Sequence, residues 1–448
     1  MAARQLSIEG HSDIADFYKG RSIFITGATG FMGKVLVERL LSACPGVEKL
    51  YLLLRSKKDT EPNTRLLQLK ESQVFDNIRR TNPSQLSKLE VMEGDITEPA
   101  LGLPQAAVER LKEVSVIFHT AATVKFDEEL KTSVIMNVLA PLRVMEVAKQ
   151  LPYLEAFVHV STAYCNCDRS VVEEKLYPPP ADLDKLLALC DALPTDLLAD
   201  ITEKYIGERP NTYTFTKAMG EHAVVKNSGQ YPIAIFRPTI VTAALSRPFP
   251  GWVDTFTGPT GVVRTLHCRK ELVTDLLPVD IAIDTLIAVG WQTAIERYIL
   301  CKTTVMFFQY EKYIREFLRH HPFDNLFLLP QFLPYNRIAC MKRILDVSEA
   351  RELYQVKLCA RLSPGDAKLF NLDPNTIEQY MYHYVRGTRK YALKEKDQDI
   401  EKAKNRLRKL WYLHYGLQAL ALILFLRYLL KSSETTRRIT LKYLFRNI

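Results

Sequence analysis

Two side chains that can move a proton stand four residues apart near the middle of the chain. They are Tyr213 and Lys217, in the segment Tyr-Thr-Phe-Thr-Lys, and a helix through it would place both groups on one face. A phenol with its ordinary pKa of about 10 is a poor proton shuttle at neutral pH. A neighbouring lysine cation would lower that pKa, so the pair predicts proton transfer to or from a reacting group.

The same spacing occurs at Tyr298 and Lys302, so spacing alone does not decide between the two pairs. Tyr213 follows a strand-like run that ends in two hydroxyl side chains, Ser161 and Thr162. A hydroxyl group beside the phenol can polarise a substrate carbonyl. We therefore assign catalysis to the Tyr213 pair, with Thr162 as the preferred hydroxyl and Ser161 as the alternative.

A glycine-rich turn lies upstream, between an apolar strand-like run and a helical pattern. Glycine at 27 permits a tight turn, at 30 it lets the backbone approach a pyrophosphate, and at 33 it lets helix and strand pack closely. The helix N-terminus favours an anion through its N–H groups and dipole. The turn predicts a dinucleotide site with contacts from Thr26, Gly27, Thr29, Gly30, Phe31, Met32 and Gly33.

The end of the second strand-like run bears on the choice of dinucleotide. An NAD-selective site carries an acid there for the ribose hydroxyl, but this chain has Arg55, followed by Lys57 and Lys58. A guanidinium can bind a 2′-phosphate and stack on adenine, which favours NADPH. A solvated basic loop is the alternative.

Later strand ends supply the other expected cofactor contacts. A carboxylate after the third strand could accept from the adenine amino group, and the lysine of the catalytic pair can hydrogen-bond the nicotinamide ribose. Pro238 and Thr239, at the end of the strand that follows the Tyr213 helix, are placed to contact the nicotinamide carboxamide. The set is Asp95, Ile96, Ala121, Ala122, Lys217, Pro238 and Thr239.

No metal site is expected. The eight cysteines form no C-x-x-C motif, and Cys165 and Cys167 are too close in sequence for zinc-knuckle spacing. We expect reduced thiols in a cytosolic environment. We expect His119 and His159 to be core or positioning residues rather than metal ligands.

The fold class follows from strand-like runs that are apolar throughout and alternate with helical stretches. This pattern predicts an α/β domain with a doubly wound parallel sheet, as in Rossmann folds. The Tyr-Pro-Pro-Pro segment at 177–180 indicates an insertion near the site mouth, followed by helix. The expected strands are 22–26, 50–55, 114–118, 156–160 and 233–236, and the first helix is 34–42.

Composition divides the chain further. We expect a lead-in at 1–20, the Rossmann domain at 21–300, a mostly helical domain at 301–410, a membrane segment at 411–430 and a basic tail at 431–448. The net charge of +9 is concentrated on both sides of the apolar segment, which indicates a lipid surface rather than nucleic acid. Three arrangements of the apolar segment at 411–430 stay open. It could be a short membrane span, an in-plane anchor with residues 440–445 on the membrane surface, or a buried core helix.

Several segments resemble the alcohol-forming fatty acyl-CoA reductases, which are extended short-chain dehydrogenases with a C-terminal male-sterility-type domain. The matching segments cover most of the chain and are 17–36, 118–127, 157–164, 177–181, 211–218, 248–254 and 384–391. The resemblance implies NADPH-dependent reduction of long-chain fatty acyl-CoA to fatty alcohol through an aldehyde. It also implies a peroxisomal or endoplasmic reticulum membrane with the catalytic domain in the cytosol, and it leaves homo-oligomerisation open.

Two segments on the substrate side depart from the family pattern. The stretch 262–275 is short, and 299–308 lacks the small polar segment that is expected there. Another extended short-chain enzyme, acting on a sugar nucleotide or a sterol, is one alternative. A non-catalytic membrane protein that binds NADPH or acyl-CoA is the other.

Overall fold

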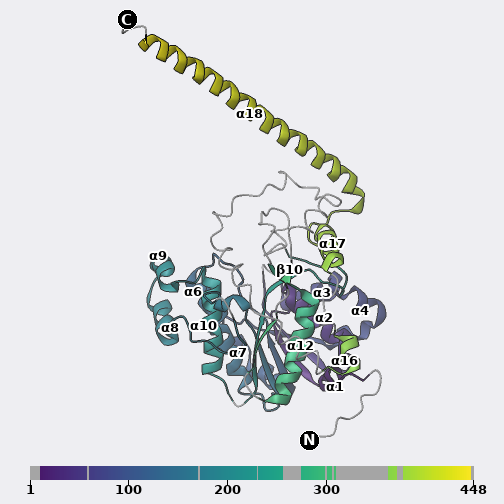
Figure 1. Cartoon of the computed structure of the whole chain (residues 1–448). Coiled ribbons are helices and arrows are strands. Elements are labelled where there is room, and N and C mark those ends of the chain that lie inside the picture. The colour runs from purple at the N-terminus through teal and green to yellow at the C-terminus, as the bar shows by residue number, and fades with distance from the viewer. Residues whose placement is uncertain are drawn as a thin grey trace.

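The computed structural model describes residues 11–57, 60–169, 172–229, 231–255, 274–297, 300–304, 307–308, 362–370 and 377–444. Tyr298 of the alternative Tyr–Lys pair, most of the short 262–275 segment and much of the expected helical domain lie outside these residues. Figure 1 shows a Rossmann body at the N-terminal end and one long helix that leaves it.

Strands and helices alternate through the first part of the chain. The strands are β1 (Ser22–Thr26), β2 (Lys49–Leu54), β3 (Leu89–Glu93), β4 (Val114–His119), β5 (Ala156–Val160), β6 (Ile233–Pro238), β7 (Ile240–Thr242), β8 (Thr274–Pro278), β9 (Leu300–Thr304) and β10 (Phe307–Phe308). The helices of the body are α1 (Asp13–Tyr18), α2 (Phe31–Ala43), α3 (Pro62–Glu71), α4 (Asp76–Thr81), α5 (Gln105–Arg110), α6 (Leu130–Val134), α7 (Ala140–Ala148), α8 (Leu183–Ala192), α9 (Thr195–Ile206), α10 (Thr212–Lys226) and α12 (Val279–Glu296).

The main sheet is parallel throughout. Its seven strands, all within the described ranges, run in the order β3-β2-β1-β4-β5-β6-β9. The predicted parallel sheet and its five expected strands are confirmed, and their observed bounds differ by at most two residues. Because parallel strands end at one edge, the loops after β1, β4, β5 and β6 gather there.

Neighbouring residues of the strands face opposite cores, which is why these runs are apolar throughout. In β1, Ile23 and Ile25 pack in the core beneath α2 and α12, whereas Phe24 joins the core beneath α7. Both faces of the sheet are therefore covered. Strand β9 adds residues 300–304 to this sheet, so the sheet extends beyond the boundary that we expected at 300.

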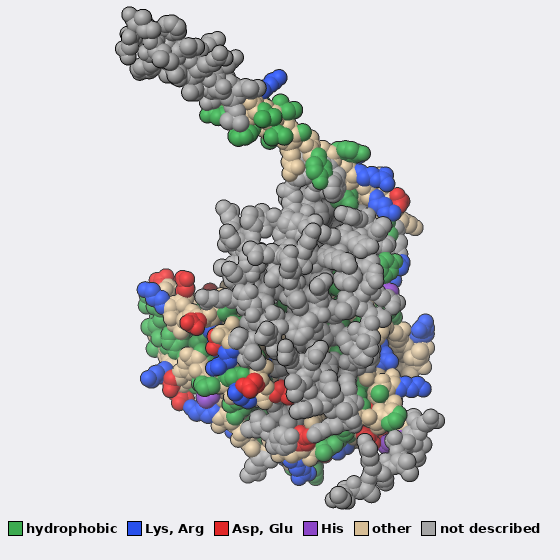
Figure 2. Space-filling view, viewed as in Figure 1, with side chains coloured by type: hydrophobic (Ala, Val, Ile, Leu, Met, Phe, Trp, Pro, Cys, Tyr) green, Lys and Arg blue, Asp and Glu red, His purple; other side chains and the backbone are tan. Residues whose placement is uncertain are grey.

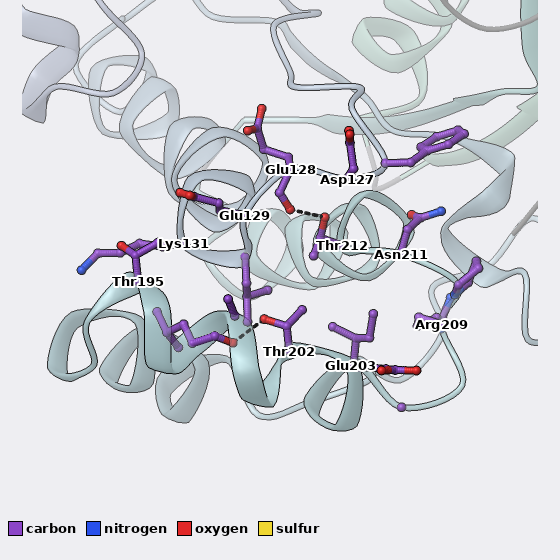
Figure 3. Close-up of a pocket in the computed structure, with 17 residues that line it drawn as sticks. Asp127, Glu128, Glu129, Lys131, Thr195, Thr202, Glu203, Arg209, Asn211 and Thr212 are labelled. Atoms are coloured by element: carbon purple, nitrogen blue, oxygen red, sulfur yellow. Dashed lines mark hydrogen bonds between the residues drawn. The ribbon is translucent and has the colours of Figure 1, made fainter.

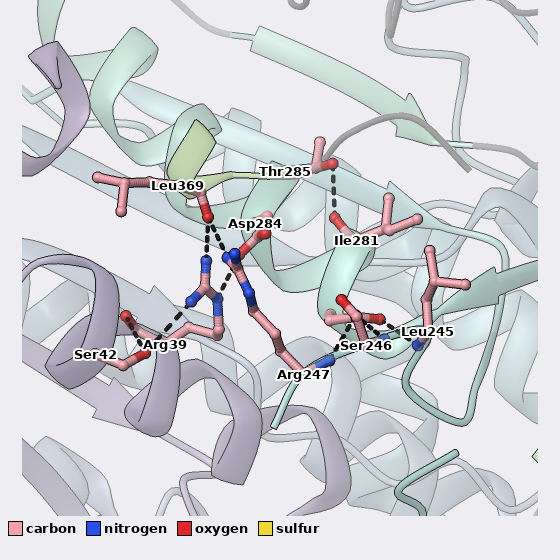
Figure 4. Close-up of polar contacts among 10 residues, drawn as sticks. Arg39, Ser42, Leu245, Ser246, Arg247, Ile281, Asp284, Thr285 and Leu369 are labelled. Atoms are coloured by element: carbon pink, nitrogen blue, oxygen red, sulfur yellow. Dashed lines mark hydrogen bonds and ion pairs between the residues drawn. The ribbon is translucent and has the colours of Figure 1, made fainter. Parts of the chain in front are cut away.

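The C-terminal segments that the structure describes are helical, and all but the last of them pack against the body. They are α16 (Pro364–Leu369), α17 (Ile377–Gly387), the π-helix η8 (Thr388–Ala392) and α18 (Ile400–Leu444). A polar cluster secures the end of α16 (Figure 4). Arg39 of α2 pairs with Asp284 of α12 at 2.7 Å and donates to the Leu369 carbonyl at 2.8 Å, and Arg247 donates to the same carbonyl.

Helix α17 meets the loop after β7 at two glycines. A Cβ on Gly387 would lie 1.8 Å from the carbonyl oxygen of Gly251, and a Cβ on Gly251 would lie 1.9 Å from the carbonyl oxygen of His383. Gly251 also has a positive φ of 76°, which other residues adopt at a cost. Two family-like segments that are far apart in the sequence therefore touch, backbone against backbone.

Helix α18 runs from the body into open space (Figure 1) and is, among the described helices, the one long and apolar enough to cross a membrane. Its side chains between Tyr412 and Tyr428 are exposed where described, with Phe425 at 57% and Leu424 at 55%. Figure 2 shows these hydrophobic side chains around the helix beyond the body. The buried-core alternative for this segment is therefore wrong.

Replacing Gly387 with alanine is expected to weaken the docking of α17, because the added Cβ has no room beside the Gly251 carbonyl. Overpacking of this kind costs about 1–3 kcal/mol, so the melting temperature should fall and proteolysis near α17 should accelerate. Gly416→Ala on α18 is the control, since nothing lies within 4 Å of a Cβ there. Equal melting temperatures for both variants and the parent would contradict the contact.

Candidate active site

The glycine-rich turn after β1 has the geometry of a phosphate-binding loop. Gly27 has a φ of 77°, and a Cβ there would lie 2.7 Å from the Ala121 nitrogen. A Cβ on Gly33 would lie 2.1 Å from the Gly27 carbonyl oxygen, so α2 begins in direct contact with the turn. Gly30 caps α2 without a side-chain hydrogen bond, which leaves the first N–H groups of the helix for an anion.

Two hydroxyl groups of this turn have internal partners. The Thr26 hydroxyl lies 2.7 Å from His119 Nδ1 and accepts from the Ala121 nitrogen at 3.3 Å, so it ties the end of β1 to the end of β4. The Thr29 hydroxyl accepts from the Arg65 guanidinium at 3.1 Å. The structure thus uses these side chains to shape the cofactor loop.

The adenosine end of the site contains a second guanidinium that sequence reasoning missed. Arg65 of α3 donates to the Arg55 carbonyl and to Thr29, beside the predicted Arg55. Burial, and next the charge of Arg55, lower the pKa of Arg65. Two cations held together in this way favour an anion beside them. The available signal was a basic residue in the first helix after β2.

The carboxylate of Asp95 is engaged by protein donors. Arg55 lies 2.8 Å from one oxygen, and the backbone and hydroxyl of Thr97 donate to the other at 2.9 Å. Burial opposes ionisation, but the hydrogen bonds from Thr97 and the Arg55 charge hold the pKa of Asp95 below its ordinary value. Asp95 therefore orients Arg55 directly, and Ile96 beside it is buried in the core.

The predicted catalytic pair, Tyr213 and Lys217, lies on α10, whose N-cap Asn211 accepts from the Thr214 nitrogen. Lys217 is 2% exposed and donates to the Val160 carbonyl at 2.8 Å. Burial lowers the pKa of Lys217 to about 8, while the charge of Glu221 opposes that shift. The ammonium group thus stands beneath the end of β5.

The environment of Tyr213 differs from the expectation. Burial raises the pKa of Tyr213 to about 12, and a hydrogen bond with Thr162 acts in the opposite direction. The expected lowering by Lys217 does not appear, because the ammonium group is directed to the Val160 carbonyl. The phenol ring lies 5.7 Å from the ring of Phe126, which is partly exposed.

The two candidate hydroxyls after β5 have distinct surroundings. The Thr162 hydroxyl accepts from the Tyr164 nitrogen at 3.3 Å, and its interaction with the Tyr213 phenol acts to lower the pKa of that phenol. Ser161 is buried beside the Cys165 thiol. The geometry brings Thr162, rather than Ser161, to the phenol.

The end of β6 supplies a further polar group. Thr239, directly after Pro238, is 5% exposed, and its hydroxyl has no hydrogen-bond partner among the described residues. A buried hydroxyl without a partner costs free energy unless a ligand or water satisfies it. Its place after β6 agrees with the predicted contact to a carboxamide.

A buried ion pair behind the lysine was also missed. Glu221 and Arg237 form two hydrogen bonds, of 2.8 and 2.6 Å, and their side chains are 3% and 0% exposed. Glu221 lies one turn after Lys217 on α10, and Arg237 is the charged residue within an otherwise apolar strand. That charge at a buried strand position was the available signal. The pair holds a carboxylate near the lysine.

The two histidines at the ends of β4 and β5 stack with their centroids 5.4 Å apart. Burial, and next the charge of Lys217, lower the pKa of His119 to about 3 and that of His159 well below its ordinary value. Both rings are therefore neutral at pH 7. The two buried rings therefore add no positive charge near Lys217.

A cavity of about 650 Å³ lies between the loop after β4, the start of α10 and α9 (Figure 3), and none of Tyr213, Thr162 and Lys217 lines it. Phe126, the ring neighbour of Tyr213, is in its wall. The carboxylates Asp127, Glu128 and Glu129 come from one side, and Glu203 comes from α9. Helix α9, in the segment after 177–180, forms one wall of the cavity.

Comparison with known proteins gives the same fold and a family. The male sterility protein profile, an NAD-binding domain, matches residues 25–286. Fatty acyl-CoA reductase 1 of Xenopus laevis is 33% identical, and that of Gallus gallus is 34% identical, with 95% of this chain and 95% of each relative covered. Fatty acyl-CoA reductase 2 of Mus musculus is 32% identical over 96% of this chain and 95% of its own.

Solved structures support the fold at lower identity. The terminal R domain of the myxalamid biosynthetic pathway matches with a TM-score of 0.52 and 20% identity, covering 82% of this chain and 90% of its own. A thiolation-reductase di-domain from an archaeal non-ribosomal peptide synthetase matches with a TM-score of 0.54 and 16% identity, covering 84% and 78%. By its sequence relatives, the chain belongs to the fatty acyl-CoA reductase family and carries the NAD-binding domain of male sterility proteins.

Proposed function

We propose that this chain uses NADPH to reduce long-chain fatty acyl-CoA to fatty alcohol through an aldehyde. Its membership in the fatty acyl-CoA reductase family supports the substrate class. The observation that carries the proposal is the phenol of Tyr213, which interacts with Thr162 and lies one helical turn from the buried Lys217 on α10. A hydroxyl pair with an adjacent ammonium group suits the activation of a carbonyl oxygen.

The described residues fit a nicotinamide dinucleotide. The turn at Gly27 and Gly33 has no room for a Cβ, and the N-terminus of α2 lacks a side-chain cap, as a bound pyrophosphate requires. The unpartnered hydroxyl of Thr239 suits the carboxamide. The adjacent guanidinium groups of Arg55 and Arg65 favour the additional 2′-phosphate of NADPH.

The chemistry divides between cofactor and protein. When bound, the reduced nicotinamide supplies a hydride to the carbonyl carbon. Tyr213 and Thr162 donate to the carbonyl oxygen and stabilise the oxyanion that forms from the thioester. That oxyanion collapses, the C–S bond breaks, and coenzyme A leaves as the thiolate with an aldehyde remaining. The aldehyde would take its hydride from a second NADPH, and the Tyr213 phenol gives its proton to the alkoxide and produces the alcohol.

Lys217 orients the site rather than touching the substrate. Its ammonium group is held at the Val160 carbonyl and can donate its other protons to the nicotinamide ribose. Glu221, fixed by Arg237, favours the charged form of the lysine.

Helix α18 would hold the enzyme at the lipid surface where a long acyl chain resides. The exposed residues 422–426 are apolar at five consecutive positions, and such a run covers every side of a helix. A helix that is apolar all round fits a span better than an in-plane anchor. We place this span in the peroxisomal or endoplasmic reticulum membrane, with the catalytic domain in the cytosol.

The first test combines product analysis with two hydroxyl variants. Detergent-solubilised protein given palmitoyl-CoA and NADPH should form fatty alcohol, and Tyr213→Phe should lower kcat by about 10²–10⁴-fold because the proton donor is lost. Thr162→Val should lower kcat as well, whereas Ser161→Ala should change it little. Mass spectrometry of the lipid products provides the measurement. Alcohol formation that survives in Tyr213→Phe would refute the assignment.

The second test concerns cofactor selectivity. Arg55→Ala and Arg65→Ala should each raise the KM for NADPH by about 10- to 100-fold, since a charged hydrogen bond to phosphate contributes about 1.5–3 kcal/mol. The KM for NADH should change little, because NADH lacks the 2′-phosphate. Initial rates with both cofactors give the measurement, and Arg80→Ala on the exposed end of α4 is the control. Parallel losses with both cofactors would contradict the assignment.

The third test is the pH dependence of kcat/KM. Lys217 loses its proton as the pH rises through its pKa of about 8, so the rate should fall above that pH. Glu221→Gln removes a charge that raises this pKa, so the falling limb should move to lower pH. Glu203→Gln on α9 is the matched control. Circular dichroism should first show that the Glu221 variant is folded. If the rate of this folded variant falls at the same pH as that of the parent, Glu221 does not raise the pKa of Lys217.

A further inference from the structure

A second cavity, of about 950 Å³, lies where the C-terminal segment meets the start of α2. Lys34 of α2 and Asp254 form one part of its wall, and residues 390–398 form another. Lys34 is next to Gly33 of the phosphate-binding turn, so this cavity lies at the same edge of the sheet as the catalytic pair. None of the groups assigned so far to catalysis or cofactor binding lines it.

The charge of this second cavity is positive. Its two carboxylates already have cations: Asp254 pairs with Lys34 at 2.5 Å, and Glu395 pairs with the buried Arg389 at 3.4 Å. Lys390, Lys394 and Lys396 are exposed, and within the described ranges none of them has a carboxylate at ion-pair distance. Three cations of like sign therefore face a shared space, an arrangement that favours an anion.

Lys394 follows Leu393, the C-cap of η8, and has the left-handed φ of 56° with which helices commonly end. The half-buried ring of Tyr391, between the lysines, adds an aromatic surface to the wall.

The two cavities have opposite character. The cavity lined by Phe126 contains four carboxylates in its wall and two cations, whereas the second cavity contains four lysines and two carboxylates. A polyanion would be repelled from the first and attracted to the second. Of the two cavities, the second is therefore the one that suits the phosphate-bearing end of a long substrate.

We propose that the second cavity binds the 3′-phosphoadenosine diphosphate end of the coenzyme A substrate. This inference rests on the proposed function for the choice of substrate. A 3′-phosphomonoester carries a charge of about −1.5 to −2 at pH 7, and the pyrophosphate adds more, which matches the three lysines. The aromatic surface of Tyr391 can lie against the adenine ring.

A phospholipid headgroup is the competing source of phosphate, and the position of the cavity disfavours it. Residues 397–409 separate Lys396 from the apolar part of α18, a rise of about 20 Å for a helical segment. Headgroups extend only about 5–8 Å from the hydrocarbon on each side. For a helix crossing near the membrane normal, the cavity lies in water, beyond the headgroup layer.

The test compares two triple variants of the full-length, detergent-solubilised protein. The pocket variant is Lys390→Ala, Lys394→Ala and Lys396→Ala. The control is Lys402→Ala, Arg408→Ala and Lys409→Ala, which removes the same charge from exposed positions of α18. Calorimetric binding of adenosine 3′,5′-bisphosphate, with NADPH saturating so that its site is filled, should weaken about tenfold or more in the pocket variant alone.

Kinetics with two thioesters provide the second measurement. The pocket variant should raise the KM for palmitoyl-CoA about tenfold and leave kcat unchanged. S-palmitoyl-pantetheine lacks the nucleotide, so its kcat/KM should be the same in the pocket variant and the parent. Unchanged KM for palmitoyl-CoA, or equal losses in both triple variants, would overturn the proposal.

The remaining outcomes separate this site from its alternatives. If the pocket variant loses binding to phosphatidylserine-containing vesicles but keeps its KM for palmitoyl-CoA, the cavity is a headgroup site and the proposal is wrong. Lysine-dependent binding of the bisphosphate by a protein that reduces no acyl-CoA would support the site and count against the reductase. Failure of the reductase is thereby distinguished from failure of the site.

Discussion

The contact between Gly33 and the Gly27 carbonyl sets the position of α2, and much of the molecule depends on that position. A side chain at Gly33 would meet the carbonyl oxygen at 2.1 Å, so only glycine lets the helix begin this close to β1. The same helix carries Lys34 at the edge of the basic cavity and Arg39 beneath the end of α16. One backbone contact thus places the cofactor turn, a wall of the second cavity and an attachment point for the C-terminal segment.

Burial governs the electrostatics of the catalytic pair. It lowers the pKa of Lys217 and raises that of Tyr213, so both groups tend towards their neutral forms. Local partners oppose each shift: the Thr162 hydrogen bond for the phenol, and the Glu221 carboxylate for the lysine. Glu221, which was not predicted from the sequence, therefore changes the pKa of Lys217, which was. Such groups are difficult to find in a sequence because their partners come from different elements.

Much of the fold was predictable because its signals are local. Apolar runs bounded by turn residues marked the strands of the parallel sheet, and the pattern of three glycines marked the start of α2. Tyr213 and Thr162 could be paired because Thr162 follows the end of β5, and Tyr213 lies in the first turn of α10, which starts at the same edge of the sheet. Arg65 escaped because nothing in the sequence shows that the first turn of α3 returns to Thr29. The extension of the sheet to β9 escaped because residues 300–304 carry polar as well as apolar side chains.

The sequence by itself determined the parallel sheet, the phosphate-binding turn, the spacing of the Tyr–Lys pair and the apolar terminal segment, because each depends on neighbours within a few residues. The tertiary structure alone decided how distant segments meet. Asp366 accepts hydrogen bonds from Ser12 and Ile14, more than 350 positions away, and Gly387 abuts Gly251. Lys390, Lys394 and Lys396 likewise share the second cavity with Lys34, which is more than 350 positions away in the sequence. Contacts of this kind arise from the packing of whole elements, and no local pattern of side chains encodes them.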